Sequence, residues 1–347
     1  MGSETRHESA EKHVSGEALY IDDLPAPANT LHAYVGLSSI AHGRLERLDL
    51  SKVSSCPGVV CVLTAQDIPG VNDTGPVFPG DPVLVEKEID FWGQVLFAVA
   101  ASSQAVARKA ARLAVPSFET QAPLNSIEEG LARSSFVRPS HSLSSGDAKQ
   151  AIAAAPRSLS GELRSGGQEH MYMEGQACLC IPQEGGGVLV YSSTQHPTGV
   201  QQSVASVLGV PMSEVTVDTR RMGGGFGGKE TQANQWACIA ALLARKTGRG
   251  VKLRLMRSDD FMATGKRHPF LSHYQVGFDD DGRLMGLDMT LSAGCGMSPD
   301  LSDPVVDRAM FHTDNAYFLP HISVTGHRIK THQASNTAFR GFGGPQG

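Results

Sequence analysis

The segment Arg221–Glu230 (RMGGGFGGKE) has the composition of a ligand-binding loop. Five of the six residues from 223 to 228 are glycine, and the segment lies between a predicted strand, 214–219, and a predicted helix, 234–246. Glycine lets the backbone adopt positive φ angles and approach a ligand closely. Successive backbone N–H groups beside a helix N-terminus bind anions and other negatively polarised oxygens. The sequence therefore predicts a site for a ligand rich in hydrogen-bond acceptors.

Two nucleotide-binding patterns also fit the spacing of these glycines. Gly223, Gly225 and Gly228 satisfy G-x-G-x-x-G, but the acidic residue expected about 20 positions later is missing. Gly228 and Lys229 match a P-loop, yet Glu230 stands where a hydroxyl should bind Mg²⁺, and its carboxylate would repel phosphates. A P-loop is therefore disfavoured. A glycine turn without any ligand stays open as an alternative, although such a turn does not need five glycines and their entropic cost.

The region 95–119 predicts a β–α–β unit upstream of the loop. Its apolar run 95–101 is typical of a buried strand, and Ser103 can cap an alanine-rich helix over 104–113. Residues 115–119 have the pattern of a weaker, edge-type strand. This unit favours an α/β first domain. The chain of 347 residues is long enough for two domains of roughly 150 residues each.

A polar, serine-rich stretch over 123–145 is interpreted as the linker between the two domains, because it is poor in apolar residues. The second domain is expected over 146–347. Its predicted elements are strands at 158–163, 177–181, 187–192 and 214–219, helices at 200–208 and 234–246, and a hairpin over 273–291.

Charge and apolar content argue against several classes of protein. The net charge of −5 disfavours a nucleic-acid partner, because phosphate contacts require a basic stripe. No apolar run approaches the roughly 18 residues of a membrane span, and the polar N-terminus does not resemble a secretory signal. The cysteines lack metal-binding spacing and are expected to be reduced thiols of a cytoplasmic protein: Cys56, Cys61, Cys178, Cys180, Cys238 and Cys295.

Five segments in order along the chain carry further signatures. They are Ser15–Pro25 (SGEALYIDDLP), Gly167–Glu174 (GQEHMYME), Ser193–Gln195 (STQ), Arg221–Glu230, and Ala338–Gln346 (AFRGFGGPQ). Together they resemble the molybdenum-binding part of the xanthine oxidase and aldehyde oxidase family. The resemblance covers nearly the whole chain from about residue 13. A chance match of five ordered segments is therefore disfavoured.

The resemblance implies an N-terminal α/β hammerhead-like domain over 1–122, the linker 123–145, and the first part of a molybdopterin-binding domain over 146–347. In this family a pterin dithiolene holds the molybdenum without a cysteine ligand from the protein, so the cofactor carries the chemistry. Fe–S clusters and FAD are expected on partner subunits or domains, within a dimer of complexes. By resemblance, the cofactor-binding residues are Gln195, Gly225, Phe226, Gly227 and Arg340, with Gln195, Phe226 and Arg340 beside the molybdenum.

By the same resemblance, three residues bind a purine substrate. Glu230 hydrogen-bonds the ring, Arg308 orients it and stabilises developing charge, and Phe342 packs against it. Aldehyde oxidases generally lack the Glu230 and Arg308 pair, so the pair indicates a purine and supplies the catalytic residues expected here. Taken singly, Arg308 could be an ion-pair partner of Asp307, Phe342 a core residue, and Gln195 a solvated strand end.

The predicted function is hydroxylation of hypoxanthine and xanthine to urate with water as the oxygen source. The family's general base lies outside this sequence, which ends at Gly347, so this chain alone is expected to be incomplete for catalysis. Glu169 and His170 are expected to be structural. Two alternatives stay open: a relative that oxidises aldehydes or other N-heterocycles, and a truncated chain without catalytic activity.

Overall fold

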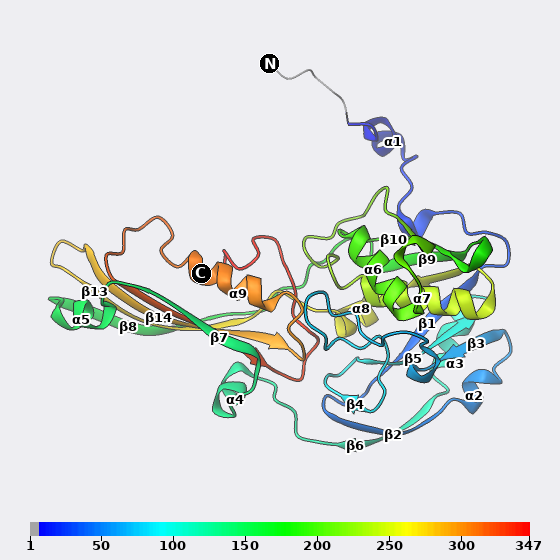
Figure 1. Ribbon diagram of the computed structural model, residues 1–347, viewed down its shortest axis with the longest axis horizontal. Coiled ribbons are helices and arrows are strands. Elements are labelled where there is room, and N and C mark those ends of the chain that lie inside the picture. The colour runs from blue at the N-terminus through cyan, green and yellow to red at the C-terminus, as the bar shows by residue number, and fades with distance from the viewer. Residues whose placement is uncertain (1–6) are drawn as a thin grey trace.

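Two β-sheets organise the chain, and the computed structural model describes residues 7–347 (Figure 1). The larger sheet has seven strands in the order β11-β10-β9-β12-β1-β5-β3, with parallel and antiparallel neighbours. Its strands are β1 (Leu31–Leu37), β3 (Val59–Leu63), β5 (Val95–Ala101), β9 (Ala177–Pro182), β10 (Val188–Ser192), β11 (Val215–Asp218) and β12 (Val251–Arg254).

The seven-stranded sheet joins the two predicted domains. Strands β1, β3 and β5 come from the first and β9 to β12 from the second, and β1 runs parallel to β12 with Leu31 opposite Val251. Helices α6 (Pro197–Leu208) and α7 (Asn234–Thr247) pack over it, and Trp236 is buried in the same core as Leu31. The two regions therefore share one hydrophobic core, whereas separate domains would each have their own.

Strand β5 is buried along its whole length, as its continuous apolar run predicts. Some of its side chains enter the main core, and the others enter a second core beneath α3 (Gln104–Ala111). The hydroxyl of Ser103 accepts a hydrogen bond from the backbone N–H of Val106 at 3.2 Å. This bond confirms the predicted helix cap.

The strand after α3 does not return to the sheet of β5, so the predicted β–α–β unit is wrong. β6 (Val115–Thr120) pairs antiparallel with β2 (Gly43–Asp49) in a three-stranded sheet that β4 (Glu88–Ile89) completes. Most β6 side chains are exposed, and Pro116 has no N–H to donate. A strand with exposed side chains is stable at the edge of the molecule, whereas a position beside the fully buried β5 would require apolar side chains. The predicted mixed α/β class is nevertheless confirmed.

The second large sheet extends away from the first (Figure 1). Its five strands have the order β7-β15-β14-β13-β8. Three helices contact it: α4 (Ile127–Ala132), α5 (Ala148–Ala154) and α9 (Ser302–Phe311). The strands are β7 (Phe136–Ser145), β8 (Arg157–Ser165), β13 (Phe270–Phe278), β14 (Leu284–Gly296) and β15 (Ile322–Lys330).

The stretch 123–145, which was expected to be a linker, contains regular structure. It includes α4, capped by the hydroxyl of Ser126, and β7, which pairs antiparallel with β15 so that Ser145 lies opposite Ile322. β7 is an edge strand with mostly exposed side chains. An edge strand is held by backbone hydrogen bonds on one side and needs little apolar surface. The polar composition of β7 is therefore compatible with a solvent-facing strand as well as with a linker.

The remaining predicted strands and helices of the second region are confirmed, with ends shifted by a few residues. The hairpin of β13 and β14 turns at residues 279–282, where Gly282 has a φ of 81°.

All six cysteines are free, and four of them are buried. Within residues 7–347, no helix is long and apolar enough to cross a membrane. The other α-helices are α1 (Ala10–Ser15), α2 (Ser51–Ser54) and α8 (Arg257–Ala263).

Two buried carboxyl groups link the N-terminal region to the five-stranded sheet. Asp81, in the loop before β4, accepts hydrogen bonds from the hydroxyls of Ser298 at 2.7 Å and Ser335 at 2.8 Å. Asp300 lies in the connection from β14 to α9. Burial, together with the charge of Asp81, raises the pKa of Asp300 to about 7, and burial also raises the pKa of Asp81. The contact is therefore more stable with a proton on this pair.

Replacing Asp300 with asparagine should flatten the pH dependence of stability. The folded protein keeps a proton on Asp300 up to about pH 7, whereas an unfolded aspartate keeps it only up to about pH 4. Stability therefore falls as the pH rises between these values, by on the order of 2–4 kcal/mol. Chemical unfolding at about pH 5 and about pH 8 should show this fall in the wild type and a smaller one in Asp300→Asn. The exposed Asp280→Asn is the control; equal falls in all three proteins would contradict the prediction.

Candidate functional site

The glycine loop follows β11 and precedes α7, as predicted, and its backbone takes conformations that favour glycine. Gly224 has a φ of 97°, Phe226 of 56° and Gly227 of 102°. A Cβ on Gly227 would lie 2.6 Å from the carbonyl oxygen of Ala338. The loop therefore crosses the chain near residue 338 at a distance that only glycine allows.

Gln195, four residues after Tyr191 of β10, supports this loop from the other side. Its Oε1 accepts hydrogen bonds from the backbone N–H groups of Gly227 at 2.8 Å and Lys229 at 3.3 Å. A Cβ on Gly225 would lie 2.5 Å from the same oxygen. Gln195 is exposed, but its amide is held by these bonds. The simple alternative of a solvated strand end therefore does not describe Gln195.

The segment 338–347 connects the glycine loop with α9. The backbone N–H of Arg340 donates to the carbonyl oxygen of Phe226 at 2.9 Å. A Cβ on Gly343 would lie 2.0 Å from the carbonyl oxygen of Val305 in α9. Phe342, between these two contacts, is half-buried and has a φ of 48°. The segment therefore fixes Phe342 between the loop and the helix.

His170 has the structural role that was expected. A Cβ on Gly228 would lie 2.6 Å from the His170 ring, and the ring Nε2 lies 2.7 Å from the carbonyl oxygen of Ala338. Burial lowers the pKa of His170, so its ring is held neutral between the loop and the 338–347 segment. The neighbouring Glu169 forms an ion pair with Lys266 at 2.7 Å.

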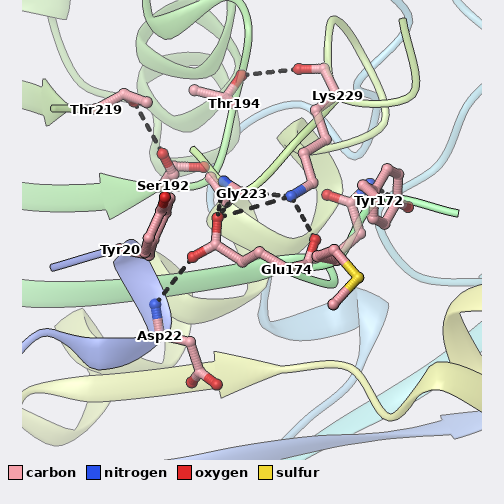
Figure 2. Close-up of polar contacts among 12 residues, drawn as sticks. Tyr20, Asp22, Tyr172, Glu174, Ser192, Thr194, Thr219, Gly223 and Lys229 are labelled. Atoms are coloured by element: carbon pink, nitrogen blue, oxygen red, sulfur yellow. Dashed lines mark hydrogen bonds and ion pairs between the residues drawn. The ribbon is translucent and has the colours of Figure 1, made fainter. Parts of the chain in front are cut away.

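A buried polar network beneath the loop was not recognised from the sequence. Lys229 is fully buried, and its Nζ donates to the carbonyl oxygen of Glu174 and to the Ser193 hydroxyl, each at 2.7 Å (Figure 2). The Glu174 carboxylate accepts from the Ser193 hydroxyl at 2.6 Å, from Gly223 N–H at 2.9 Å and from Asp22 N–H at 3.1 Å. Glu174 therefore connects the N-terminal segment, β10 and the loop.

The ammonium group of Lys229 is the positive charge at the centre of this network. Burial lowers its pKa to about 8, while the charge of Glu174 opposes this effect. The ammonium lies 4.5 Å from the centre of the Tyr172 ring, a favourable cation–π distance. In the sequence, Lys229 was considered as part of a possible P-loop and as part of the segment Arg221–Glu230, and no role was assigned to its side chain. Glu174 and Tyr172 did belong to a recognised signature, but their pairing with Lys229 requires the fold.

The three candidate substrate residues lie on different elements. Glu230 ends the loop and is partly buried, and burial raises its pKa while the charge of His196 opposes this. Arg308 is exposed on α9, with its Nε 3.4 Å from Nε2 of His312. Within residues 7–347, no hydrogen bond or ion pair joins Glu230, Arg308 or Phe342 to one another. Asp307, the suggested partner of Arg308, binds Arg328 instead.

The loop has the properties of a cradle for a cofactor rich in acceptors. Five of its positions have no side chain, and in the described part of the chain no acceptor pairs with the backbone N–H groups of Gly224, Gly225 and Phe226. Free amides on a side-chain-free turn fit the oxygens and ring nitrogens of a pterin cofactor. No cluster of three or more histidine, cysteine, aspartate or glutamate residues suited to a metal occurs among residues 7–347.

Residues 132–347 match the family described as the molybdopterin cofactor-binding domain. Residues 15–122 match the α/β hammerhead domain of aldehyde oxidase and xanthine dehydrogenase. The chain belongs to the aldehyde oxidase and xanthine dehydrogenase family. This membership agrees with the resemblance carried by the five sequence segments.

Relatives of this family align along almost the whole chain. The chain is 41% identical to the xanthine dehydrogenase of Dictyostelium discoideum over 341 residues, which are 98% of this chain and 25% of the relative. It is 39% identical over 348 residues to aldehyde oxidase 3 of Rattus norvegicus, covering 100% of this chain and 26% of the relative. The chain therefore spans about a quarter of the length of these relatives.

The fold is also that of a solved aldehyde oxidoreductase. The structure matches the aldehyde oxidoreductase from Desulfovibrio gigas with a TM-score of 0.91 at 25% sequence identity. The match covers 98% of this chain and 39% of that protein. The overall fold of the chain is therefore shared with this part of that protein.

Gly225→Ala should disturb the cofactor cradle. Its new Cβ would lie 2.5 Å from Oε1 of Gln195, so Gln195 must move and give up its bonds to Gly227 and Lys229. We expect a loss of about 1–3 kcal/mol in stability, as for other overpacked sites, and a lower molybdenum content in the protein isolated with its cofactor. Thermal unfolding and metal analysis measure the two effects.

The matched control is Gly166→Ala, because no atom lies within 4 Å of a Cβ at that position. Wild-type stability and molybdenum content in Gly225→Ala would show that Gln195 does not hold the loop as described.

Proposed function

We propose that this chain forms the molybdopterin-binding part of a purine hydroxylase that converts hypoxanthine and xanthine to urate. The observation that carries the proposal is Glu230: it ends the cofactor-type loop, is partly buried, and has a raised pKa because of that burial. A carboxyl group in such a place can form a hydrogen bond with the ring nitrogens of a heterocycle. Aldehydes offer no ring nitrogen to this group.

The cofactor would be held by the loop and by the two segments that contact it. When bound, the molybdenum cofactor supplies the two-electron oxidation of a substrate carbon, with oxygen derived from water. Gln195, the backbone of Phe226 and the backbone of Arg340 would lie beside the metal. Gly225 and Gly227 would shape the cofactor site, because the absence of their side chains lets Gln195 and the Ala338 carbonyl approach the loop. Lys229 and Glu174 would hold the loop from behind as a paired ammonium and carboxylate.

Three side chains would then position the purine. Glu230 would hydrogen-bond the ring, and Arg308 would donate to a carbonyl oxygen and stabilise negative charge as it develops there. Phe342, fixed between the loop and α9, would pack against the ring and orient it. These residues bind and orient, while the proton-accepting base would come from a part of the enzyme outside these 347 residues.

The complete activity would require further protein. The relatives are about four times as long as this chain, and electrons from the substrate would pass to Fe–S clusters and FAD on other domains or subunits. A second candidate function is oxidation of aldehydes or other N-heterocycles. It is favoured by the 39% identity to aldehyde oxidase 3 and by the likeness to a bacterial aldehyde oxidoreductase.

Turnover assays with the complete enzyme should separate these two functions. Metal analysis should find molybdenum, and xanthine should be oxidised with a higher kcat/KM than benzaldehyde, because only the purine engages Glu230 and Arg308. Oxidation of benzaldehyde alone would support the second candidate. A bound redox nucleotide without molybdenum would contradict the cofactor assignment.

Glu230→Ala should impair xanthine turnover much more than molybdenum content. Loss of one hydrogen bond to the ring should lower kcat/KM for xanthine by about 10²-fold or more, because a buried polar contact to substrate is then unpaired. Benzaldehyde turnover is the internal control and should change little. Equal losses of molybdenum and of both activities would show that Glu230 is a structural residue.

A further inference from the structure

Helix α9 is held by an arginine that lies beneath it in the sheet. Arg328 of β15 is fully buried, and its guanidinium binds two carboxylates of α9. Its Nε donates to Asp303 at 2.9 Å, and its terminal nitrogen donates to Asp307. Asp303 and Asp307 are four residues apart, so they lie on the same face of the helix, one turn from each other.

The sheet is shaped so that α9 can approach this arginine closely. Gly326 precedes Arg328 by two residues and therefore faces the same side of β15. A Cβ on Gly326 would lie 2.5 Å from the sulfur of Met310 and 2.8 Å from Val306, both in α9. The helix thus rests directly on the strand at Gly326, and the guanidinium fork joins two successive turns. Both contacts restrict rotation of α9 about its axis.

Arg328 fixes the rotation of α9 about its axis, and this rotation determines the direction in which Arg308 points. Arg308 follows Asp307 by one position, or about 100° around the helix, and is exposed. Within the described residues, no carboxylate lies at ion-pair distance from Arg308. Asp307 is the nearest acidic residue in sequence, and it is already bound by Arg328 and lies 2.8 Å from Nδ1 of His141.

The same helix also supports the aromatic candidate. Gly343 packs against the carbonyl oxygen of Val305, and a Cβ on Gly347 would lie 2.0 Å from the carbonyl oxygen of Ala309. The chain on both sides of Gly344 therefore follows the surface of α9. A rotation of the helix would move Arg308 and the segment that carries Phe342 together.

We propose that Arg328 is a positioning residue for Arg308: it fixes the rotation of α9 and keeps Asp307 from neutralising the Arg308 guanidinium. This inference rests on the proposed function, in which Arg308 contacts the substrate. Arg328 itself is fully buried and takes no part in contacts with the substrate. The consequence is specificity, because an unpaired guanidinium favours a substrate with polar ring substituents over a simple aldehyde.

The test uses the complete, cofactor-loaded enzyme. Arg328→Leu removes the fork that fixes α9 and leaves the charge of Asp307 uncompensated near Arg308, so KM for xanthine should rise by about ten-fold while benzaldehyde kinetics stay within about two-fold. Equilibrium binding of urate should weaken by a similar factor, which gives a readout independent of turnover. Arg328→Lys keeps the charge but not the fork geometry, so it should give a smaller change in the same direction.

Two further variants separate positioning from general damage. Arg138→Leu is the matched control, because Arg138 lies in the neighbouring strand and binds only Asp303 of the helix, at 3.0 Å. Its xanthine KM should stay within about two-fold of the wild type. Arg328→Leu combined with Asp307→Asn should recover much of the lost xanthine affinity, because the neutral amide no longer competes for Arg308 and Asp303 keeps Arg138.

Two outcomes distinguish failure of this inference from failure of the proposed function. If Arg308→Ala leaves xanthine KM and urate binding unchanged, the purine function itself is wrong. If Arg308→Ala weakens both while Arg328→Leu and Arg328→Lys match the wild type, the positioning role is overturned. Equal losses for xanthine and benzaldehyde, or no recovery in the double variant, would also overturn it and assign Arg328 to general stability.

Discussion

The site depends on one close contact, in which the glycine loop crosses the chain near Ala338 without intervening side chains. The loop belongs to the seven-stranded sheet, and the segment after β15 belongs to the five-stranded sheet. The carbonyl of Ala338 occupies the space that a Cβ on Gly227 would fill. The hydrogen bond from Arg340 to Phe226 closes the same junction. A side chain at Gly227 would push the loop away from the segment after β15, at the junction where Gln195, Phe226 and Arg340 meet, so glycine is a structural requirement there.

Buried charges fix the elements around this junction. Lys229 lies beneath the loop and Arg328 beneath α9, and both side chains are fully buried. Each is bound by several oxygens from different elements, which offsets the cost of removing a charge from water. The partners of a buried charge can occupy few alternative positions, because moving one partner leaves the charge without a hydrogen bond. The loop and the helix are therefore held in defined positions from the protein side, and their outer surfaces remain available for ligands.

The sequence predicted local structure better than the assembly of the sheets. The run 95–101 was recognised as a strand because it is apolar throughout, and Ser103 marked the start of the following helix. The same reasoning misplaced 115–119, because local pattern does not say which sheet a strand joins. It also interpreted 123–145 as a linker, since the edge strand at its end is held by backbone bonds and carries no distinctive side chains. The sequence also did not reveal that the two predicted domains share one hydrophobic core.

By itself, the sequence determined that a glycine-rich loop lies between a strand and a helix. It also predicted that this loop binds an acceptor-rich ligand, and that Glu230 makes a nucleotide phosphate a poor candidate. These conclusions depend on residue type and neighbours along the chain, which the sequence contains. Only the tertiary structure decided that Lys229 pairs with Glu174 and that Arg328 binds Asp307 of α9. Such pairs join residues far apart in the chain or on different elements. Their geometry depends on sheet order and helix rotation, which no local pattern specifies.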